Sequence, residues 1–190
     1  MDTRCIYTKL IWRFIKNNIM RLSILILALL LTTSCTLNSV GDAFDDSRNE
    51  SLAKKRVRDA HPGLAEANIS VSSFDGVLLI TGQVSSAELI PIAYAQVAPM
   101  RNARKIYNEL TVAGKTSLLS RTNDSWLTTK LKSAFSAAEF SDATRIKVVT
   151  ENGVVYLMGL LTRAEADAAA NIAREIQGVQ KVVKIFDYIN

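Results

Sequence analysis

The sequence predicts an α+β protein in which one small module, helix-strand-strand-helix-strand, occurs twice in tandem. The stretch Glu151–Gly159 joins an Asn-Gly turn to a short β-branched and aromatic run that a second glycine closes, and Phe74–Gly82 has the same pattern 77 positions earlier. The same offset relates four further pairs: Ala87/Ala164, Glu88/Glu165, Ala93/Ala170 and Ile106/Val183. We expect each module to form a three-stranded mixed sheet with both helices on one face.

The net charge of +5 is unevenly distributed along the 190 residues. Residues 1–34 contribute +4, residues 35–113 contribute −1 and residues 114–190 contribute +2. Nucleic-acid binding needs a basic patch on the folded domain, so a charge that lies mainly at the N-terminus gives no support for it. The small positive balance of the second module favours that module as the one that meets anionic partners.

Residues 1–34 are organised like a secretory signal peptide. Arg21 precedes the apolar run Leu22–Leu31, which is too short to span a bilayer as a mature helix, and small residues follow it. Met20 together with this run is already a complete leader, so residues 1–19 can come from an upstream start codon.

Cys35, directly after the small residues, resembles the lipobox cysteine of bacterial lipoproteins, whose thiol receives a diacylglycerol. Thr32 stands where the lipobox favours leucine, and the alternative is an ordinary signal peptide with an incidental cysteine. Because Thr36 replaces the aspartate that retains lipoproteins at the inner membrane, the resemblance implies transport to the outer membrane. We expect residues 35–47 to form the lipidated cysteine and a flexible polar tether.

The first module is expected over residues 48–113. Its first helix is predicted at Ser51–Ala60, with a basic run on the solvent side that is typical of a solvated helix face. A capping box of Ser85 and Glu88 predicts the start of the second helix, which runs through Val97. The predicted strands are Asn68–Ser72, Val77–Thr81 and Arg104–Val112, with a hairpin turn at Asp75-Gly76.

The second module is expected over residues 123–190, after a linker at 114–122. An amphipathic helix is predicted at Asp124–Glu139, capped by Asn123 or Asp124. A capping box of Thr162 and Glu165 starts an alanine-rich helix that Gly178 ends. The predicted strands are Arg145–Thr150, Val154–Met158 and Lys181–Ile189.

The helix Asp124–Glu139 carries the candidate binding site. Leu127 and Leu131 belong to its core stripe, whereas Trp126 lies about 100° away from Leu127. A tryptophan off the core stripe, with a lysine one turn later, is typical of a residue at a membrane interface. The alternative is a tryptophan that covers the edge of the core, and spacing alone does not separate the two. The candidate lipid-binding residues are Trp126, Thr129, Lys130, Lys132, Ser133 and Ala137.

The chain has few residues suited to catalysis or metal binding. Its one histidine, His61, precedes Pro62-Gly63 and has no metal-ligand partner at a suitable spacing. Of the two cysteines, neither lies in a module, and Cys35 is the candidate lipidation site. No carboxylate pair or glycine-rich phosphate loop stands at a useful spacing, so we expect neither an enzyme nor a cofactor or metal site.

Both modules resemble the BON domain. The second carries the motif best, in Gly153-Val154, Gly159, Ala164, Ala169, Ala173 and Gly178-Val179. The first keeps Gly76-Val77, Gly82, Ala87 and Ala93 but has Arg101-Asn102 in place of the late Gly-Val pair. Two such domains after a lipobox resemble the dual-BON lipoproteins of the bacterial outer membrane.

The resemblance implies a non-enzymatic protein that faces the periplasm from the outer membrane, with a role in outer-membrane integrity and enrichment at division sites. It implies binding of anionic phospholipids such as phosphatidylglycerol and cardiolipin through Asp124–Glu139, with Trp126 as the membrane-inserting residue. The alternative function is a scaffold whose exposed strand edges bind outer-membrane assembly or envelope-stress proteins.

Overall fold

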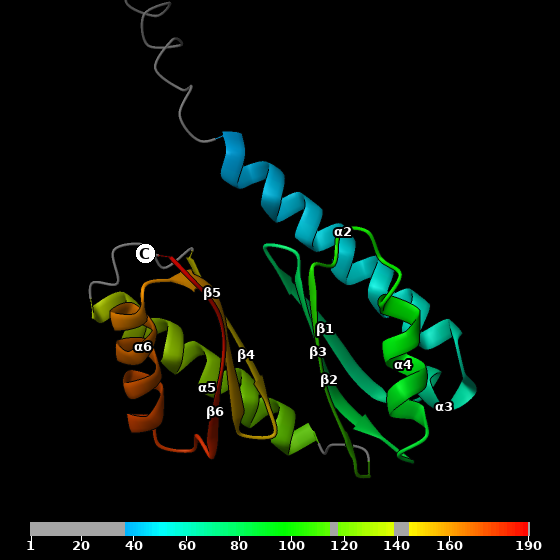
Figure 1. Cartoon of the computed structure of the whole chain (residues 1–190). Coiled ribbons are helices and arrows are strands. Elements are labelled where there is room, and N and C mark those ends of the chain that lie inside the picture. Colours follow the sequence, from blue (N-terminus) through cyan, green and yellow to red (C-terminus); the bar gives the residue numbers. More distant parts are fainter. Residues whose placement is uncertain (1–36, 115–117, 139–144, 190) are drawn as a thin grey trace, which may run out of the picture. The chain divides into compact units, whose positions relative to one another are not determined.

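The computed structural model describes residues 37–114, 118–138 and 145–189 (Figure 1). Asp42–Asn190 is one compact unit that contains two copies of the predicted arrangement. The first copy consists of α2 (Leu37–Asp59), α3 (Pro62–Ala65), β1 (Asn68–Phe74), β2 (Val77–Val84), α4 (Leu89–Val97) and β3 (Lys105–Val112). The second consists of α5 (Leu118–Ala137), β4 (Ile146–Glu151), β5 (Val154–Leu161), α6 (Arg163–Glu175) and β6 (Lys181–Tyr188).

Each copy has a three-stranded mixed sheet, which confirms the predicted fold class. In the first sheet β2 pairs antiparallel with β1 and parallel with β3, and in the second β5 pairs in the same way with β4 and β6. The antiparallel pairs are joined by two-residue turns, Asp75-Gly76 and Asn152-Gly153, in which both residues have positive φ. This is the turn geometry whose twist matches that of the flanking strands. A parallel pair needs a crossover, which α4 and α6 supply.

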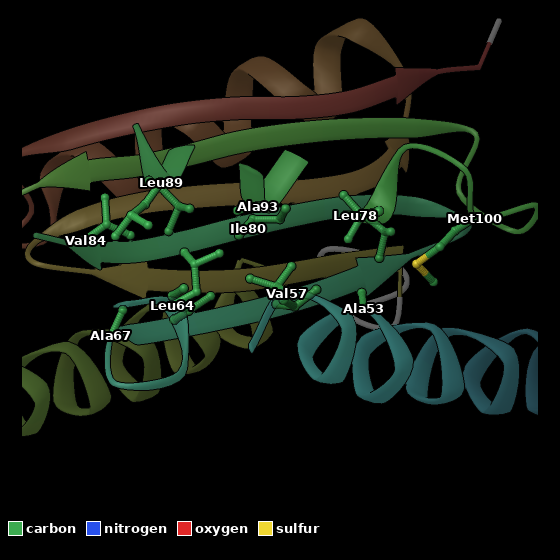
Figure 2. Close-up of a cluster of buried hydrophobic side chains, with 14 residues drawn as sticks. Ala53, Val57, Leu64, Ala67, Leu78, Ile80, Val84, Leu89, Ala93 and Met100 are labelled. Atoms are coloured by element: carbon green, nitrogen blue, oxygen red, sulfur yellow. The ribbon is translucent and has the colours of Figure 1, made fainter. Parts of the chain in front are cut away.

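The first core lies between α2, α4 and one face of the first sheet (Figure 1). Figure 2 shows Ala53 and Val57 of α2 beside Leu64 of α3, with Leu78 and Ile80 of β2 facing them. The short helix α3 was not expected from the sequence. Its N-cap is His61, whose Nδ1 accepts a hydrogen bond from the Gly63 N–H at 3.0 Å.

The second core has the same construction with smaller side chains on the crossover helix. Leu131 and Phe135 of α5 and the alanines of α6 are buried against β4, β5 and β6. Because alanine is small, α6 can pack close to the sheet. Its capping box is present as predicted, since Thr162 Oγ1 accepts from the Glu165 N–H and the Glu165 carboxylate accepts from the Thr162 N–H.

A third apolar cluster joins the faces of the two sheets that the helices leave uncovered. It contains Val77 and Leu79 of β2, Tyr156 and Met158 of β5, and Ile185 of β6. The side chains of β2 alternate between the first core and this cluster, so every residue of β2 is buried. A strand that is covered on both faces explains the continuous apolar run Val77–Ile80.

The helix after β2 begins later than predicted. Glu88 is the N-cap of α4 and makes no side-chain capping bond, so the Ser85–Glu88 capping box does not form. A helix capped by Ser85 would place Pro91 in its interior, where proline removes a backbone bond and its ring clashes with the preceding turn. With the helix starting at Leu89, Pro91 falls in the first turn, where N–H groups lack an intrahelical partner in any case.

The first helix of each copy begins earlier than predicted. Helix α2 begins at Leu37, within the expected tether, and α5 begins at Leu118, within the expected linker. Asp124 is therefore an interior residue of α5 rather than its cap. The alanine-rich helix α6 ends at Glu175 with Ile176 as its C-cap, so Gly178 lies in the following turn, with a φ of +100°.

The repeat offset of 77 does not extend to the last strand. Leu78 pairs with Ile106, and its equivalent Val155 pairs with Val182, so the structural partner of Ile106 is Val182 rather than Val183. A slip of one residue turns a side chain to the opposite face of a sheet. Ile106 and Val182 accordingly pack against the two helix-covered cores, whereas Val183 packs against the cluster between the sheets.

Candidate functional site

The candidate site lies on α5, whose buried side fixes it to the second module. Leu127 and Leu131 are fully buried and Phe135 nearly so. Thr128 Oγ1 lies 2.9 Å from Thr150 Oγ1 of β4, which adds a polar contact on the same side. These contacts determine which face of the helix remains exposed.

Asp124 fastens α5 to the turn between β4 and β5. It is only 7% exposed, and its carboxylate oxygens accept hydrogen bonds from the N–H groups of Asn152 at 2.8 Å and Gly153 at 2.9 Å. Both turn residues have positive φ, so their N–H groups point away from the ladder and need another partner. An aspartate with two acceptor oxygens satisfies both.

The first copy contains the same device. Asp46 of α2 accepts hydrogen bonds from the N–H groups of Asp75 at 2.8 Å and Gly76 at 3.2 Å, and from Ser73 Oγ at 2.6 Å. Sequence reasoning missed this pair of clamps because it took Asp124 as a helix cap and placed Asp46 in the tether. The available signal was an aspartate 30 residues before the turn glycine in the first copy and 29 residues before it in the second.

The structure brings the predicted binding residues together on the exposed side of α5. Trp126 is 48% exposed and belongs to none of the three apolar clusters. The Lys130 Nζ lies 3.9 Å from the centre of the Trp126 ring, which is cation–π geometry. The other predicted residues are also exposed: Thr129, Lys132, Ser133 and Ala137.

A shallow depression lies beside the tryptophan–lysine pair. It is lined by Thr129, Lys132, Ser133, Ser136 and Ala137. Ser136 was absent from the predicted set, although it follows Lys132 by one helical turn and the spacing therefore indicated it. The predicted residues thus form one continuous surface rather than separate points.

The exposed charge of α5 is entirely positive in its described residues. Lys130, Lys132 and Arg121 are exposed, whereas the one acidic residue, Asp124, is buried on the opposite side. The side chain of Thr129 donates to the Ser125 carbonyl oxygen at 3.0 Å, which leaves its oxygen able to accept but not to donate. Thr129 therefore cannot donate to an anion, whereas the exposed lysines and the Trp126 ring suit a ligand that is anionic and partly apolar.

Ion pairs accompany the apolar contact between the two copies. Lys147 of β4 pairs with Glu50 of α2 and donates to the Ser73 carbonyl oxygen at 2.9 Å. Asp187 of β6 pairs with Lys105 and with Arg104, whose Nη2 lies 2.6 Å from Asp187 Oδ2. The hydrogen bond from Lys105, together with that from Arg104, lowers the pKa of Asp187 despite partial burial.

Glu151, at the end of β4, faces the first copy. Its Oε1 accepts a hydrogen bond from Gln83 Nε2 at 2.7 Å. Burial raises the pKa of Glu151, the Gln83 hydrogen bond opposes the rise, and the nearby Asp124 adds to it. Burial likewise raises the pKa of Tyr156 to about 12, with Glu109 and Glu151 as neighbouring negative charges.

The predicted lipidation site, Cys35, and the predicted signal peptide lie outside the described residues. Within the described ranges, no helix has the length and hydropathy needed to cross a bilayer. The same part of the chain holds no cluster of three or more histidine, cysteine, aspartate or glutamate side chains that could bind a metal ion.

Comparison with known proteins identifies both copies. The BON domain family matches residues 45–114 and 123–190. One relative is the protein named outer membrane lipoprotein DolP of Haemophilus influenzae, to which the chain is 37% identical over 152 residues. This match covers 80% of the chain and 79% of the relative. The chain is 38% identical over 152 residues, covering 80% of the chain and 78% of the relative, to a 21 kDa hemolysin of Actinobacillus pleuropneumoniae. It is 27% identical over 150 residues, 77% of the chain and 74% of the relative, to osmotically-inducible protein Y of Escherichia coli.

Proposed function

The chain belongs to the BON domain family, with two copies of the domain in tandem, and we propose that it is a non-catalytic outer-membrane lipoprotein that binds anionic phospholipid. The binding element is the exposed face of α5 in the second domain, with Trp126 at its centre. Through this contact the protein supports the integrity of the outer membrane from its periplasmic side. The lipoprotein assignment draws on the relative that carries that name and on the sequence around Cys35.

The observation that carries the proposal is the exposed Trp126–Lys130 pair on a rigidly held helix. Tryptophan has an apolar ring and a polar N–H, so it is stabilised at the boundary between headgroups and acyl chains. Lys130 beside it, and Lys132 further along the exposed face, are attracted to lipid phosphates by about 1 kcal/mol each near an anionic surface. Because Asp124 and the core leucines fix the helix, the face is formed before the membrane is met.

Attachment at two points lets a weak contact be sufficient. Acyl chains on Cys35 would confine the domain to the membrane surface, so binding by α5 becomes an intramolecular event at high effective concentration. The attraction between lysine and phosphate is screened by salt, whereas burial of the Trp126 ring is much less affected. The contact is therefore expected to weaken, but not to disappear, at raised ionic strength.

The test uses the chain from Thr36 onward, in which Trp126 is the only tryptophan because the other, Trp12, lies in the leader. We expect its fluorescence to shift to the blue with phosphatidylcholine vesicles that contain phosphatidylglycerol, and the protein to sediment with them. Trp126→Glu should abolish sedimentation at physiological ionic strength. Tyr94→Glu is the matched control, since Tyr94 of α4 is also an exposed aromatic, at 45% against 48% for Trp126.

Equal sedimentation of the wild type and Trp126→Glu would refute the site. Lipid titration followed by NMR chemical shifts then locates the contact, and shifts confined to α5 are expected. Vesicles with cardiolipin in place of phosphatidylglycerol test whether negative charge, rather than one headgroup, is recognised.

The anchor is tested separately. Radioactive palmitate is expected to label the native chain in its host and to leave Cys35→Ala unlabelled. An unlabelled native chain would contradict lipidation without affecting the α5 site. A strain that carries Trp126→Glu should become sensitive to detergents that an intact outer membrane excludes, and its envelope phenotype should resemble loss of the whole protein.

A second candidate function, docking of an outer-membrane assembly or envelope-stress protein, has one specific observation in its favour. Leu160, Tyr188 and Ile189 are each exposed at the ends of β5 and β6, where the Ile189 N–H donates to the Leu161 carbonyl oxygen. The Arg163 guanidinium lies 4.8 Å from the Tyr188 ring. Tyrosine and arginine are frequent in protein interfaces. A crosslink to a protein that survives Trp126→Glu but is lost in Tyr188→Ala would favour this function.

A further inference from the structure

The aspartate clamps define which residues of α2 and α5 are equivalent. Asp46 and Asp124 make the same contacts with their turns, so positions in the two helices correspond with a difference of 78. The buried positions agree with this alignment. Ala53 matches Leu131, Val57 matches Phe135, and all four side chains are apolar and buried. The clamp therefore fixes a structural register that the sequences of the helices do not show.

In this register the exposed face of α2 matches the candidate lipid face of α5. Arg48 stands at the position of Trp126 and Leu52 at that of Lys130, so the apolar and cationic residues have exchanged places. Leu52 is 45% exposed, and a shallow depression lined by Ser47, Arg48, Ser51, Leu52 and Lys55 surrounds it. The first domain thus presents a cationic side chain followed by an apolar one, in the opposite order to α5.

The exposed charge of α2 is as positive as that of α5. Over Asp45–Asp59 the exposed charged residues are five basic (Arg48, Lys54, Lys55, Arg56, Arg58) and two acidic (Asp45, Asp59), a net of +3. The other two acidic residues, Asp46 and Glu50, are engaged on the inner side with β1, its turn and Lys147. The exposed acidic Asp59 offsets Lys55 through an ion pair.

We propose that this face, centred on Leu52 and Arg48, is a second contact for an anionic phospholipid surface. The exposed Leu52, with Arg48 and Lys55 in the same depression, complements a surface that is negatively charged and apolar beneath its headgroups. Arg48 is 13 residues from Cys35, so an anchored chain holds this face near lipid. The inference rests on the proposed function for the chemistry of the ligand, but the residues involved are separate from those of α5.

The two faces cannot meet one flat bilayer in the same orientation. The apolar contact between the sheets occupies the faces that the helices leave uncovered, so α2 and α5 lie on opposite outer sides of the two sheets. Two lipid-binding faces on opposite sides would allow one molecule to join two anionic surfaces. The α2 contact depends mainly on charge, and it is therefore the more sensitive of the two to salt.

The experiment measures each face with its own label. The chain from Thr36 keeps all three apolar clusters and contains no cysteine, so a single cysteine can carry an environment-sensitive fluorophore. Labels at Ser51→Cys on α2 and Thr129→Cys on α5 should both enter an apolar environment on phosphatidylglycerol vesicles at low ionic strength. A label at Ser70→Cys on β1 is the control and should not change.

Light scattering then tests the joining of vesicles. The wild type is expected to cluster phosphatidylglycerol vesicles at low ionic strength, and either Trp126→Glu or the double variant Arg48→Glu/Leu52→Glu should abolish clustering. In the Trp126→Glu background, adding Arg48→Glu should weaken the remaining low-salt binding about tenfold or more, because a reversed charge replaces attraction by repulsion. Lys181→Glu, at the start of β6, is the matched charge reversal and should change it little.

The outcomes separate this inference from the proposed function. If the label at position 129 enters lipid and the label at position 51 stays in water, the α5 site stands and the α2 face is an ordinary solvated helix surface. If only the label at position 51 enters lipid, the α2 contact stands and the α5 site is wrong. Absence of both changes overturns both.

Discussion

The clamp formed by Asp124 yields the sharpest stability prediction. Asp124→Ala leaves the N–H groups of Asn152 and Gly153 without their acceptors, and the Gly153 bond is fully buried. An unsatisfied buried donor costs about 1–3 kcal/mol, and the Asn152 N–H recovers part of its loss from water, so we expect a loss of about 2–4 kcal/mol. For a unit of this size that corresponds to a fall in Tm of roughly 5–15 °C.

The assay is thermal and urea unfolding of the chain from Thr36, followed by Trp126 fluorescence and circular dichroism. Asp167→Ala is the matched control, because Asp167 pairs with Lys184 at 2.7 Å on the surface, and an exposed ion pair contributes little to stability. Asp124→Asn keeps one acceptor oxygen and should fall between Asp124→Ala and the wild type. The reasoning would be wrong if Asp124→Ala unfolded at the same temperature as the Asp167→Ala control.

Three further predictions concern the scaffold. Gly82→Ala should prevent stable folding, because a Cβ there would lie 1.9 Å from the Asn68 carbonyl oxygen at a φ of +129°, whereas Gly114→Ala, with open space around it, should unfold like the wild type. Burial raises the pKa of Glu151 above its ordinary 4.5. Between 4.5 and the raised pKa, the native state holds a proton that the unfolded state has lost, so stability falls as pH rises through this range. Glu151→Gln should remove this fall. The difference in urea midpoint between the wild type and the variant should then change across this pH range, and a constant difference would contradict the prediction. Thr162→Ala should lower the free energy of unfolding in urea by about 1 kcal/mol, because the cap of α6 is lost. Ser85→Ala should change it little, and equal effects of the two variants would show that the Thr162 box is unimportant.

The two capping boxes show where local sequence is sufficient and where it is not. The residues Ser85 to Glu88 and Thr162 to Glu165 have the same spacing, but only the second forms a box. The difference is a proline six residues after Ser85, which makes the earlier helix start incompatible with a regular backbone. A capping box was therefore predictive where no residue further along conflicted with it.

The contact between the sheets was not predictable from the modules taken singly. Periodicity identified the core face of each strand, but the cluster that includes Leu79 and Met158 forms only when two complete sheets meet. Its trace in the sequence is the apolar run without alternation in β2 and in β5. Partners such as Gln83 and Glu151 are 68 residues apart and leave no local pattern.

The candidate site was predictable because it depends on a single helix. Spacing placed Trp126 one turn from Lys130 and away from the core stripe, and the structure puts Lys130 Nζ over the indole ring. What spacing could not decide was whether Trp126 covers the core edge. Its exposure and its absence from the apolar clusters favour the interfacial role, and vesicle binding will test it.

The comparison of α2 with α5 shows how a duplicated scaffold can acquire two surfaces. The inner sides of the helices keep what the fold needs, an aspartate for the turn and apolar residues for the sheet. The outer sides are free of that requirement, because substitutions at exposed helix positions change stability little. Arg48 and Trp126 occupy the same structural position with different chemistry, so one face depends on charge and the other on an aromatic ring. Salt should therefore separate their contributions: as ionic strength rises, binding that remains should depend increasingly on Trp126 and decreasingly on Arg48.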